Sequence, residues 1–179
     1  MISIVYDVDI YRKILRERVN EGDIVIEIGP HIGKSTSCYE RKVKLGILVD
    51  KSIESEKGLQ SLLKKNKNLK FIKGDARSFK TVKKVMELTN SCNFLALDVG
   101  GGRYPDTVFK IWAIWSGVFK PKNSVIRNRG LAEFVQKLKI EDKSLKRKFR
   151  DDGWLSEYGR AIPSALKKQL DEFKFWVNI

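Results

Sequence analysis

The chain of 179 residues is 42% hydrophobic and 32% charged, a balance that excludes a largely disordered protein and indicates one compact domain. Its apolar runs have the length of strands and stay far below the ~20 residues of a membrane span, so we expect a soluble, cytoplasmic protein without a signal peptide. The formal net charge of +14 favours an anionic partner such as nucleic acid, although a lysine-rich proteome would decorate its surfaces in the same way.

Short runs of β-branched residues alternate with stretches of helical periodicity, which is typical of βαβ units and a parallel sheet with helices on both faces. A helix is expected first, over residues 9–19, because apolar residues recur there every three to four positions. The core strands are expected at 23–28, 44–50, 68–73, 93–98 and 124–127. Helices are expected between them, one beginning after Gly33 and the others at 53–65, 79–88 and 105–117.

Beyond residue 130 the pattern indicates a helix over 131–140, a basic run over 143–150, a last helix over 164–170 and a strand over 173–177. The last strand is expected to pair antiparallel beside the strand at 124–127. The sequence therefore predicts a single α/β domain over residues 1–179 with a doubly wound, mostly parallel sheet. Its expected parts are an N-terminal helix (1–21), a cofactor-binding core (22–129) and a basic segment that completes the sheet (130–179).

The turn after the first core strand, EIGPHIG (27–33), lies at the edge where an open parallel sheet binds its ligand. Glycines in such a turn let the backbone approach a ligand closely. The stretch GPHIGKS (29–35) is similar to a phosphate-binding P-loop, but that loop needs four residues between its glycines and this one has fewer. Glu27 would also repel a triphosphate, so a nucleotide-binding enzyme is the weaker hypothesis.

Acidic residues follow the next strands and suit a ligand that carries a nucleoside and a positive charge. Asp50 ends the second core strand about 20 residues after Glu27, the spacing at which a dinucleotide-type fold places its ribose-binding carboxylate. Asp75 follows the third strand and Asp98 the fourth. An acid at the end of a strand can also cap the turn that follows, and this alternative remains open for Asp98.

Together these residues resemble the class I S-adenosylmethionine-dependent methyltransferases, whose fold is Rossmann-like. The likeness covers residues 22–129. The segments similar to the family's motifs, in order, are EIGPHIG (27–33), LVD (48–50), GDA (74–76), LALD (95–98) and the turn FKPKNS (119–124) before the fifth strand.

The resemblance implies an S-adenosylmethionine site with a role for each motif. Gly29 and Gly33 would lie near the methionine moiety, Asp50 would bind the ribose hydroxyls and Asp75 the adenine amino group, with Ala76 beside the ring. The cofactor-binding residues expected on this basis are Glu27, Gly29, Pro30, His31, Gly33, Asp50, Lys51, Asp75, Ala76 and Asp98.

Methyl transfer from a sulfonium is an in-line displacement, for which positioning and the exclusion of water supply much of the rate. The expected catalytic candidates are Asp98, Tyr104 and His31. His31 replaces a small residue of the family motif and is either a base or an exposed loop residue, and Tyr104 is either catalytic or packed at a helix entry. The Asn/Asp-Pro-Pro-aromatic tetrapeptide of enzymes that methylate exocyclic amino groups is absent after Asp98, and the segment through Tyr104 looks more like the small O-methyltransferases.

No metal site is expected. The position after the fifth strand carries Arg127 and Arg129 instead of acids, and two cysteines with one histidine are too few for a structural zinc. Arg103, Arg127 and Arg129 are expected to orient an anionic substrate, or else to lie at a solvated strand edge.

The basic run has Phe149 inside it and Trp154 just beyond. Cations interleaved with aromatic rings suit a phosphate backbone and stacked bases, although the same run can form a solvated helix face. The candidate nucleic-acid contacts are Lys143, Lys146, Arg147 and Arg150.

The sequence therefore predicts an S-adenosylmethionine-dependent methyltransferase of unidentified acceptor, with RNA or another anionic molecule as the hypothesis. One alternative is a non-catalytic module of the same fold that binds RNA or a protein as a subunit, and another is the P-loop enzyme. No membrane partner is expected, and the oligomeric state is left open.

Overall fold

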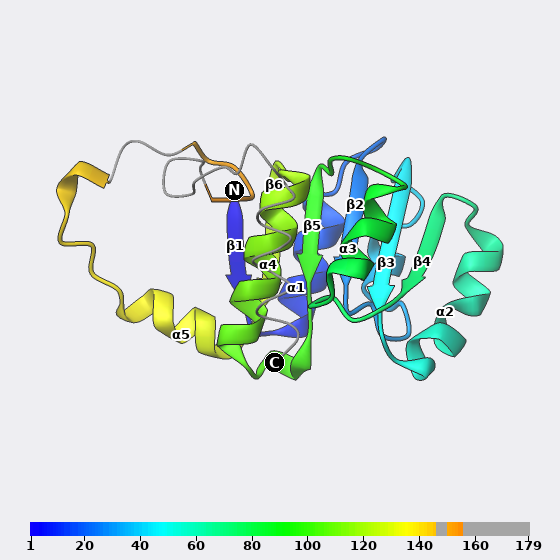
Figure 1. Cartoon of the computed structure of the whole chain (residues 1–179), viewed down its shortest axis with the longest axis horizontal. Coiled ribbons are helices and arrows are strands. Elements are labelled where there is room, and N and C mark those ends of the chain that lie inside the picture. The colour runs from blue at the N-terminus through cyan, green and yellow to red at the C-terminus, as the bar shows by residue number, and fades with distance from the viewer. Residues whose placement is uncertain (146–149, 156–179) are drawn as a thin grey trace.

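The computed structural model describes residues 1–145 and 150–155. Within these residues a six-stranded sheet runs in the order β1-β6-β5-β2-β3-β4 (Figure 1). Its strands are β1 (Ile2–Val5), β2 (Ile24–Ile28), β3 (Leu45–Asp50), β4 (Leu69–Lys73), β5 (Phe94–Leu97) and β6 (Asn123–Arg127). All neighbouring strands pair parallel, so their carboxyl ends lie at one edge of the sheet.

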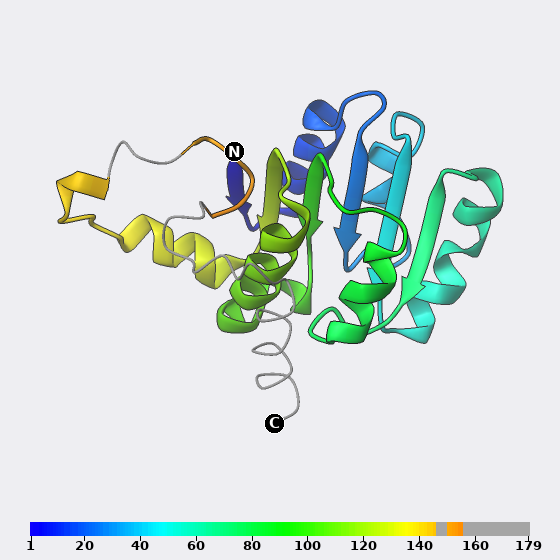
Figure 2. The same cartoon turned by 45° about the horizontal axis from the view of Figure 1, so that its top comes forward.

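Helices cover both faces of this sheet, and two buried clusters separate them from it (Figures 1 and 2). Helices α3, α4 and α5 pack on one face, and α1 and α2 pack on the other. The helices are α1 (Val8–Arg18), α2 (Ile53–Lys65), α3 (Phe79–Met86), α4 (Pro105–Phe119) and α5 (Arg129–Lys137), with short 3₁₀ segments η1 (Thr36–Cys38), η2 (Gly100–Gly102) and η3 (Lys143–Leu145). Among these helices, none combines the length and the apolar composition that crossing a bilayer requires.

The strands form where the sequence supplies side chains for two buried faces. In β2, Ile26 and Ile28 belong to the cluster under α3 and α4, whereas Val25 belongs to the cluster under α1. Strands buried on both faces have near-continuous apolar sequences, and this is the pattern by which they were predicted. The predicted α/β class is confirmed, and each core strand begins and ends within one residue of its expected bounds.

The N-terminal segment differs from the prediction. Residues 1–21 were expected to form a helix alone, but Ile2–Val5 forms β1, which pairs parallel with β6. The run Ile2–Val5 reads ISIV, and its two consecutive apolar residues break the strict alternation by which a short strand is recognised. The place beside β6, where the antiparallel strand at 173–177 was expected, is therefore occupied by β1. That strand and the helix at 164–170 lie outside the described residues.

The helix expected after Gly33 is also absent. Turns and η1 connect β2 to β3 instead. Ser35, Thr36 and Ser37 disfavour a helix because their hydroxyls compete for backbone hydrogen bonds. The connection is held by tertiary contacts, since Thr36 is fully buried.

Candidate functional site

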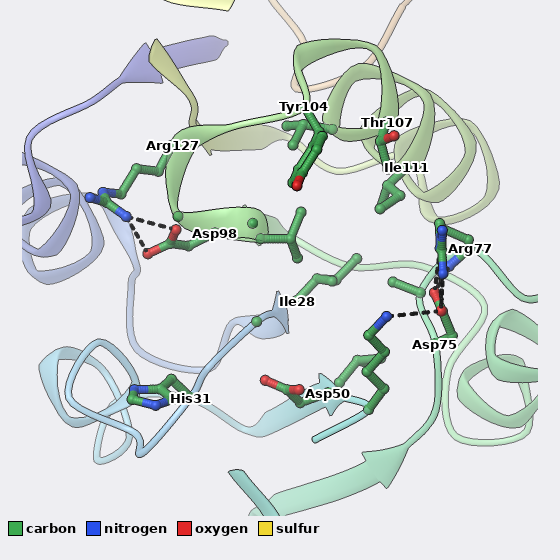
Figure 3. Close-up of a pocket in the computed structure, with 18 of the residues that line it drawn as sticks. Ile28, His31, Asp50, Asp75, Arg77, Asp98, Tyr104, Thr107, Ile111 and Arg127 are labelled. Carbon is green, nitrogen blue, oxygen red and sulfur yellow. Dashed lines mark hydrogen bonds and ion pairs between the residues drawn. The ribbon is translucent and has the colours of Figure 1, made fainter. Parts of the chain in front are cut away.

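A cavity of about 640 Å³ opens beside the carboxyl ends of β2, β3 and β5 and the loops that follow them (Figure 3). Strand β2 is where the chain reverses its direction across the sheet, with β3 on one side and β5 on the other. Open α/β sheets bind ligands at such a switch point, and the volume suits a nucleoside-sized molecule. The predicted cofactor residues that line the cavity are Gly29, His31, Asp50, Lys51, Asp75, Ala76 and Asp98.

Gly29 brings the turn after β2 against the end of β5. Its φ of +83° lies in the left-handed region, and a β-carbon placed there would come 2.0 Å from the backbone oxygen of Asp98. Its amide donates to the carbonyl of Val49 at 2.9 Å, which ties the turn to β3 as well. Only glycine fits this position, and the close packing that it allows places the turn at the wall of the cavity.

Asp50 ends β3 and presents its carboxylate at the cavity. Its Oδ1 accepts from the amide of Ser52 at 2.9 Å, and its Oδ2 accepts from the hydroxyl of Ser55 at 2.7 Å. These two bonds hold the carboxylate at the start of α2. A carboxylate has about four acceptor sites, so Asp50 keeps acceptors for a second partner such as a vicinal diol.

Asp75, after β4, lines the same cavity. The guanidinium of Arg77 donates to both of its oxygens, with Nη2 2.7 Å from Oδ2 and Nε 3.0 Å from Oδ1, and Lys51 Nζ lies 3.5 Å from Oδ2. The hydrogen bonds from Arg77 are the main cause that lowers the pKa of Asp75 to about 2. Ala76 fixes the loop, because its carbonyl accepts from Trp115 Nε1 at 2.8 Å.

Asp98 and Arg127 form an ion pair at the other end of the cavity. Arg127 Nη1 donates to Asp98 Oδ1 at 3.0 Å and to Oδ2 at 3.3 Å, and Arg127 Nε donates to the carbonyl of Tyr6 at 2.8 Å. Burial raises the pKa of Asp98 above its ordinary value, and the guanidinium of Arg127 opposes that rise. Arg127 therefore fixes the position of the Asp98 carboxylate and neutralises its charge.

Glu27 does not line the cavity, although it was among the residues expected to bind the cofactor. It is 1% exposed and points to the face of the sheet that α1 covers, where it accepts from the hydroxyls of Thr36 at 2.5 Å and Tyr39 at 2.6 Å. Burial raises its pKa to about 7. Its observed contacts anchor the connection between β2 and β3. Pro30 and Gly33 are buried and likewise do not line the cavity.

Two of the predicted catalytic residues lie at the rim. His31 lines the cavity, has a φ of 50° and places Nε2 3.5 Å from Glu54 Oε1. Tyr104 lines the opposite side, has a φ of 56° and is 61% exposed (Figure 3). A non-glycine residue with positive φ is uncommon outside functional loops and turns. Within the described residues neither side chain forms a hydrogen bond with Asp98, whose partner is Arg127, so the three candidates surround the cavity without forming a triad.

The predicted substrate residues separate into two groups. Arg103 and Arg127 line the cavity, and Arg129 lies beside the ring of Tyr6. Lys143 and Arg150 are exposed and do not line it, and the remaining two, Lys146 and Arg147, lie outside the described residues. In the part of the chain that the structure describes, no three His, Cys, Asp or Glu side chains gather as a metal site. The absence of a catalytic metal stays a prediction.

Sequence reasoning missed Arg77 and the apolar wall of the cavity. Arg77 carries a local signal, because it is two residues from Asp75 and can fold back on it. Thr107, Val108 and Ile111 come from α4, whose approach to the cavity depends on packing. Spacing along the chain does not reveal such a contact.

No protein-family model matches the chain, and no curated protein sequence matches it. Among solved structures, an rRNA methylase from Streptococcus thermophilus is similar with a TM-score of 0.54 and 13% identity, over 73% of this chain and 78% of that one. Fibrillarin from Aeropyrum pernix, whose structure holds natively bound S-adenosyl-L-methionine, gives a TM-score of 0.48 and 19% identity over 62% and 48%. The chain shares the fold of that rRNA methylase, and the predicted Rossmann-like architecture is confirmed.

Proposed function

We propose that the protein is an S-adenosylmethionine-dependent methyltransferase whose acceptor is RNA or another anionic molecule. The main support is that Asp50 and Asp75, from the ends of adjacent strands, present carboxylates to one cavity beside the Gly29 turn. Ionised carboxylates only accept hydrogen bonds, and an adenosine offers donors in its ribose hydroxyls and its amino group. Asp50 would hold the ribose and Asp75 the adenine.

The residues present fit such a cofactor. Its sulfonium would supply the methyl group for an in-line displacement, which needs no covalent intermediate on the protein. Gly29 lets the turn after β2 pack directly against the backbone of Asp98, since a β-carbon there would collide with it, and the methionine portion would pass beside this turn. Val99, Val108 and Ile111 give the cavity an apolar wall that excludes water. We assign the catalytic contribution chiefly to positioning, with Asp98 nearest the acceptor and Tyr104 and His31 at the rim.

The pairing of Asp98 with Arg127 favours the alternative of a non-catalytic module. Arg127 occupies both oxygens of Asp98, so the reaction end of the cavity has no unpaired carboxylate among the described residues that line it. A module that binds the cofactor without methyl transfer would keep the Asp50 and Asp75 contacts and need no base. The P-loop alternative has less support, because the stretch 29–35 leads into turns and η1 and lacks the helix N-terminus on which a phosphate would sit.

Calorimetry with S-adenosylhomocysteine tests the proposal, with S-adenosylmethionine, ATP with magnesium, and NAD as comparisons. We expect heat from the first two ligands only, and at least a tenfold weaker affinity in Asp50→Ala. Asp23→Ala is the matched control, because Asp23 also accepts from a backbone amide, that of Asn20 at 2.8 Å, but at the opposite edge of the sheet. A folded protein that binds neither sulfur compound, or an equal loss in both variants, would contradict the cofactor assignment.

Methyl transfer is measured separately, with radiolabelled S-adenosylmethionine and total RNA. Label in the RNA that requires Asp98 supports catalysis. Tight cofactor binding with no label in RNA, protein or small molecules would favour the non-catalytic module.

A further inference from the structure

An exposed aromatic ring lies beside the cavity and belongs to none of the cofactor motifs. Tyr6 follows β1 and is 47% exposed. The guanidinium carbons of Arg127 and Arg129 lie 5.6 and 5.7 Å from the centroid of its ring, within the range of cation–π attraction. Gly102 fixes the ring from a third side, because a β-carbon there would come 2.8 Å from Tyr6 Cε2. The ring is thus held in place while nearly half of the residue faces solvent.

The three arginines on this side of the cavity differ in whether a carboxylate neutralises their charge. Asp98 neutralises Arg127, whereas Arg129 and Arg103 are exposed and have no carboxylate partner within residues 1–145 and 150–155. Asn128 fixes the two loops that carry them. Its buried amide donates to the carbonyl of Arg103 at 2.9 Å and accepts from the amide of Leu131 at 2.9 Å. Asn128 therefore ties the loop of Arg103 to the start of α5, where Arg129 lies beside the aromatic ring.

This surface is continuous with the cavity. Arg103, Tyr104 and Arg127 line the cavity, and Tyr104 and Arg127 lie across it from Asp50 (Figure 3). The exposed ring of Tyr104 is the second aromatic group on this side. We call the four residues Tyr6, Arg103, Tyr104 and Arg129 the aromatic–arginine rim. It borders the end of the cavity away from the proposed ribose site, where an acceptor would enter.

We propose that the aromatic–arginine rim binds single-stranded nucleic acid, with a base stacked on Tyr6 and the flanking phosphates at Arg129 and Arg103. This inference rests on the proposed methyltransferase function and names the class of its acceptor. Unpaired bases stack on aromatic side chains and on guanidinium planes whatever their identity, whereas a duplex hides their faces. The net charge of +14 adds long-range attraction for a polyanion. An acidic peptide would pair with the arginines but leave both exposed rings without a partner.

Fluorescence anisotropy of the full chain tests this binding. The probes are a labelled single-stranded RNA of about 12 nucleotides, a DNA strand of the same sequence, and the RNA duplex. We expect the single strands to bind more tightly than the duplex. Tyr6→Leu should weaken binding of the single strand about 5- to 100-fold, because it removes one stacked base, and Tyr6→Phe should retain the affinity.

The phosphate contacts are tested by salt dependence between about 50 and 200 mM salt. The slope of log affinity against log salt is negative, and Arg129→Ala should make it less steep by about 0.7, as the loss of one phosphate contact on a single strand predicts. Arg41→Ala is the matched control, since Arg41 is exposed and precedes β3 at the opposite edge of the sheet. It removes the same charge and should leave the slope unchanged.

Binding of S-adenosylhomocysteine by each variant separates the two proposals. The rim assignment is supported if Tyr6→Leu and Arg129→Ala bind S-adenosylhomocysteine normally but show the expected losses in oligonucleotide binding. A preference between the RNA and the DNA strand then identifies the kind of nucleic acid. Three results would contradict the rim assignment: no binding of oligonucleotides, tightest binding of the duplex, or equal affinities in Tyr6→Leu and Arg41→Ala. The methyltransferase proposal would stand in each case, provided that the wild type binds S-adenosylhomocysteine. If the wild type binds single-stranded oligonucleotides as expected but does not bind S-adenosylhomocysteine, only the methyltransferase proposal is contradicted.

Discussion

Asp98 and Arg127 follow paired positions of adjacent strands, because Leu97 of β5 is in register with Ile126 of β6. Their side chains therefore point to the same face and meet at 3.0 Å. This relationship decides the electrostatics of the cavity. Asp98 contributes no net negative charge at the reaction end, and Arg127 is no free phosphate ligand, so a polyanion must rely on Arg103 and Arg129.

The ion pair predicts a pH-dependent cost for Arg127→Ala. The variant leaves Asp98 in a partly buried site without its main partner, which costs about 1–3 kcal/mol of unfolding free energy at pH 7.5. Because burial already raises the pKa of Asp98, loss of Arg127 raises it further. A protonated Asp98 needs no cation, so the cost should shrink at pH 5. Urea unfolding of variant and wild type at both pH values measures the difference.

Arg129→Ala is the control for this comparison, since Arg129 is exposed and has no carboxylate partner in the described residues. Its cost should stay within about 0.5 kcal/mol at both pH values. An equal loss in Arg127→Ala at pH 5 and pH 7.5 would show that packing on Tyr6, and not the charge of Asp98, explains the destabilisation.

The raised pKa of Glu27 predicts that its contribution to the free energy of unfolding falls as pH rises. Its pKa is raised from 4.5 to about 7 in the folded state, so the folded chain holds this proton more tightly than the unfolded chain. The resulting stabilisation is fully present below the unfolded value and is lost as pH rises through about 7. Each pKa unit corresponds to about 1.4 kcal/mol, which gives roughly 3 kcal/mol across this window. Unfolding free energies at half-unit steps between pH 4.5 and 8 measure the slope.

Glu27→Gln should remove that slope, because the amide keeps an oxygen for Thr36 or Tyr39 and does not titrate. Glu133→Gln, on the exposed side of α5, removes a carboxylate that pairs with Lys137 and should leave the slope as in the wild type. The assignment to Glu27 is refuted if Glu27→Gln retains the wild-type slope.

The cavity could be predicted from the sequence as far as it depends on the order of elements. Strands β3 and β4 were recognisable, and parallel strands bring Asp50 and Asp75 to one edge whatever the details of packing. The start of α2 was also local information, because Ser52 caps the helix through the amide of Ser55.

The rest required tertiary contacts. Spacing places Glu27 at the end of β2 but does not say which face it takes, and it points away from the cavity toward Tyr39. The pairing of Asp98 with Arg127 depends on the register of strands far apart in the chain. Tyr6 reaches the cavity rim only because β1 pairs with β6, and the sequence of β1 alone does not predict this pairing.

Gly29 and Gly22 allow backbone strain to be separated from steric exclusion. Both have positive φ, +83° and +80°, so alanine costs about 1–2 kcal/mol at either position through the left-handed conformation. At Gly29 the new β-carbon would also lie 2.0 Å from the carbonyl oxygen of Asp98, whereas at Gly22 nothing lies within 4 Å. We expect Gly29→Ala to cost about 1–3 kcal/mol more than Gly22→Ala, because backbone at the end of β5 must move.

The same displacement shifts the turn that borders the proposed methionine site, so Gly29→Ala should weaken S-adenosylhomocysteine binding at least tenfold while Gly22→Ala leaves it unchanged. Urea unfolding and calorimetry on the same preparations give both quantities. Equal unfolding costs for the two variants would mean that the turn relaxes around a β-carbon, and the close approach of Gly29 to Asp98 would then not be what shapes the cavity. A destabilised Gly29→Ala that still binds with full affinity would place the ligand away from this turn.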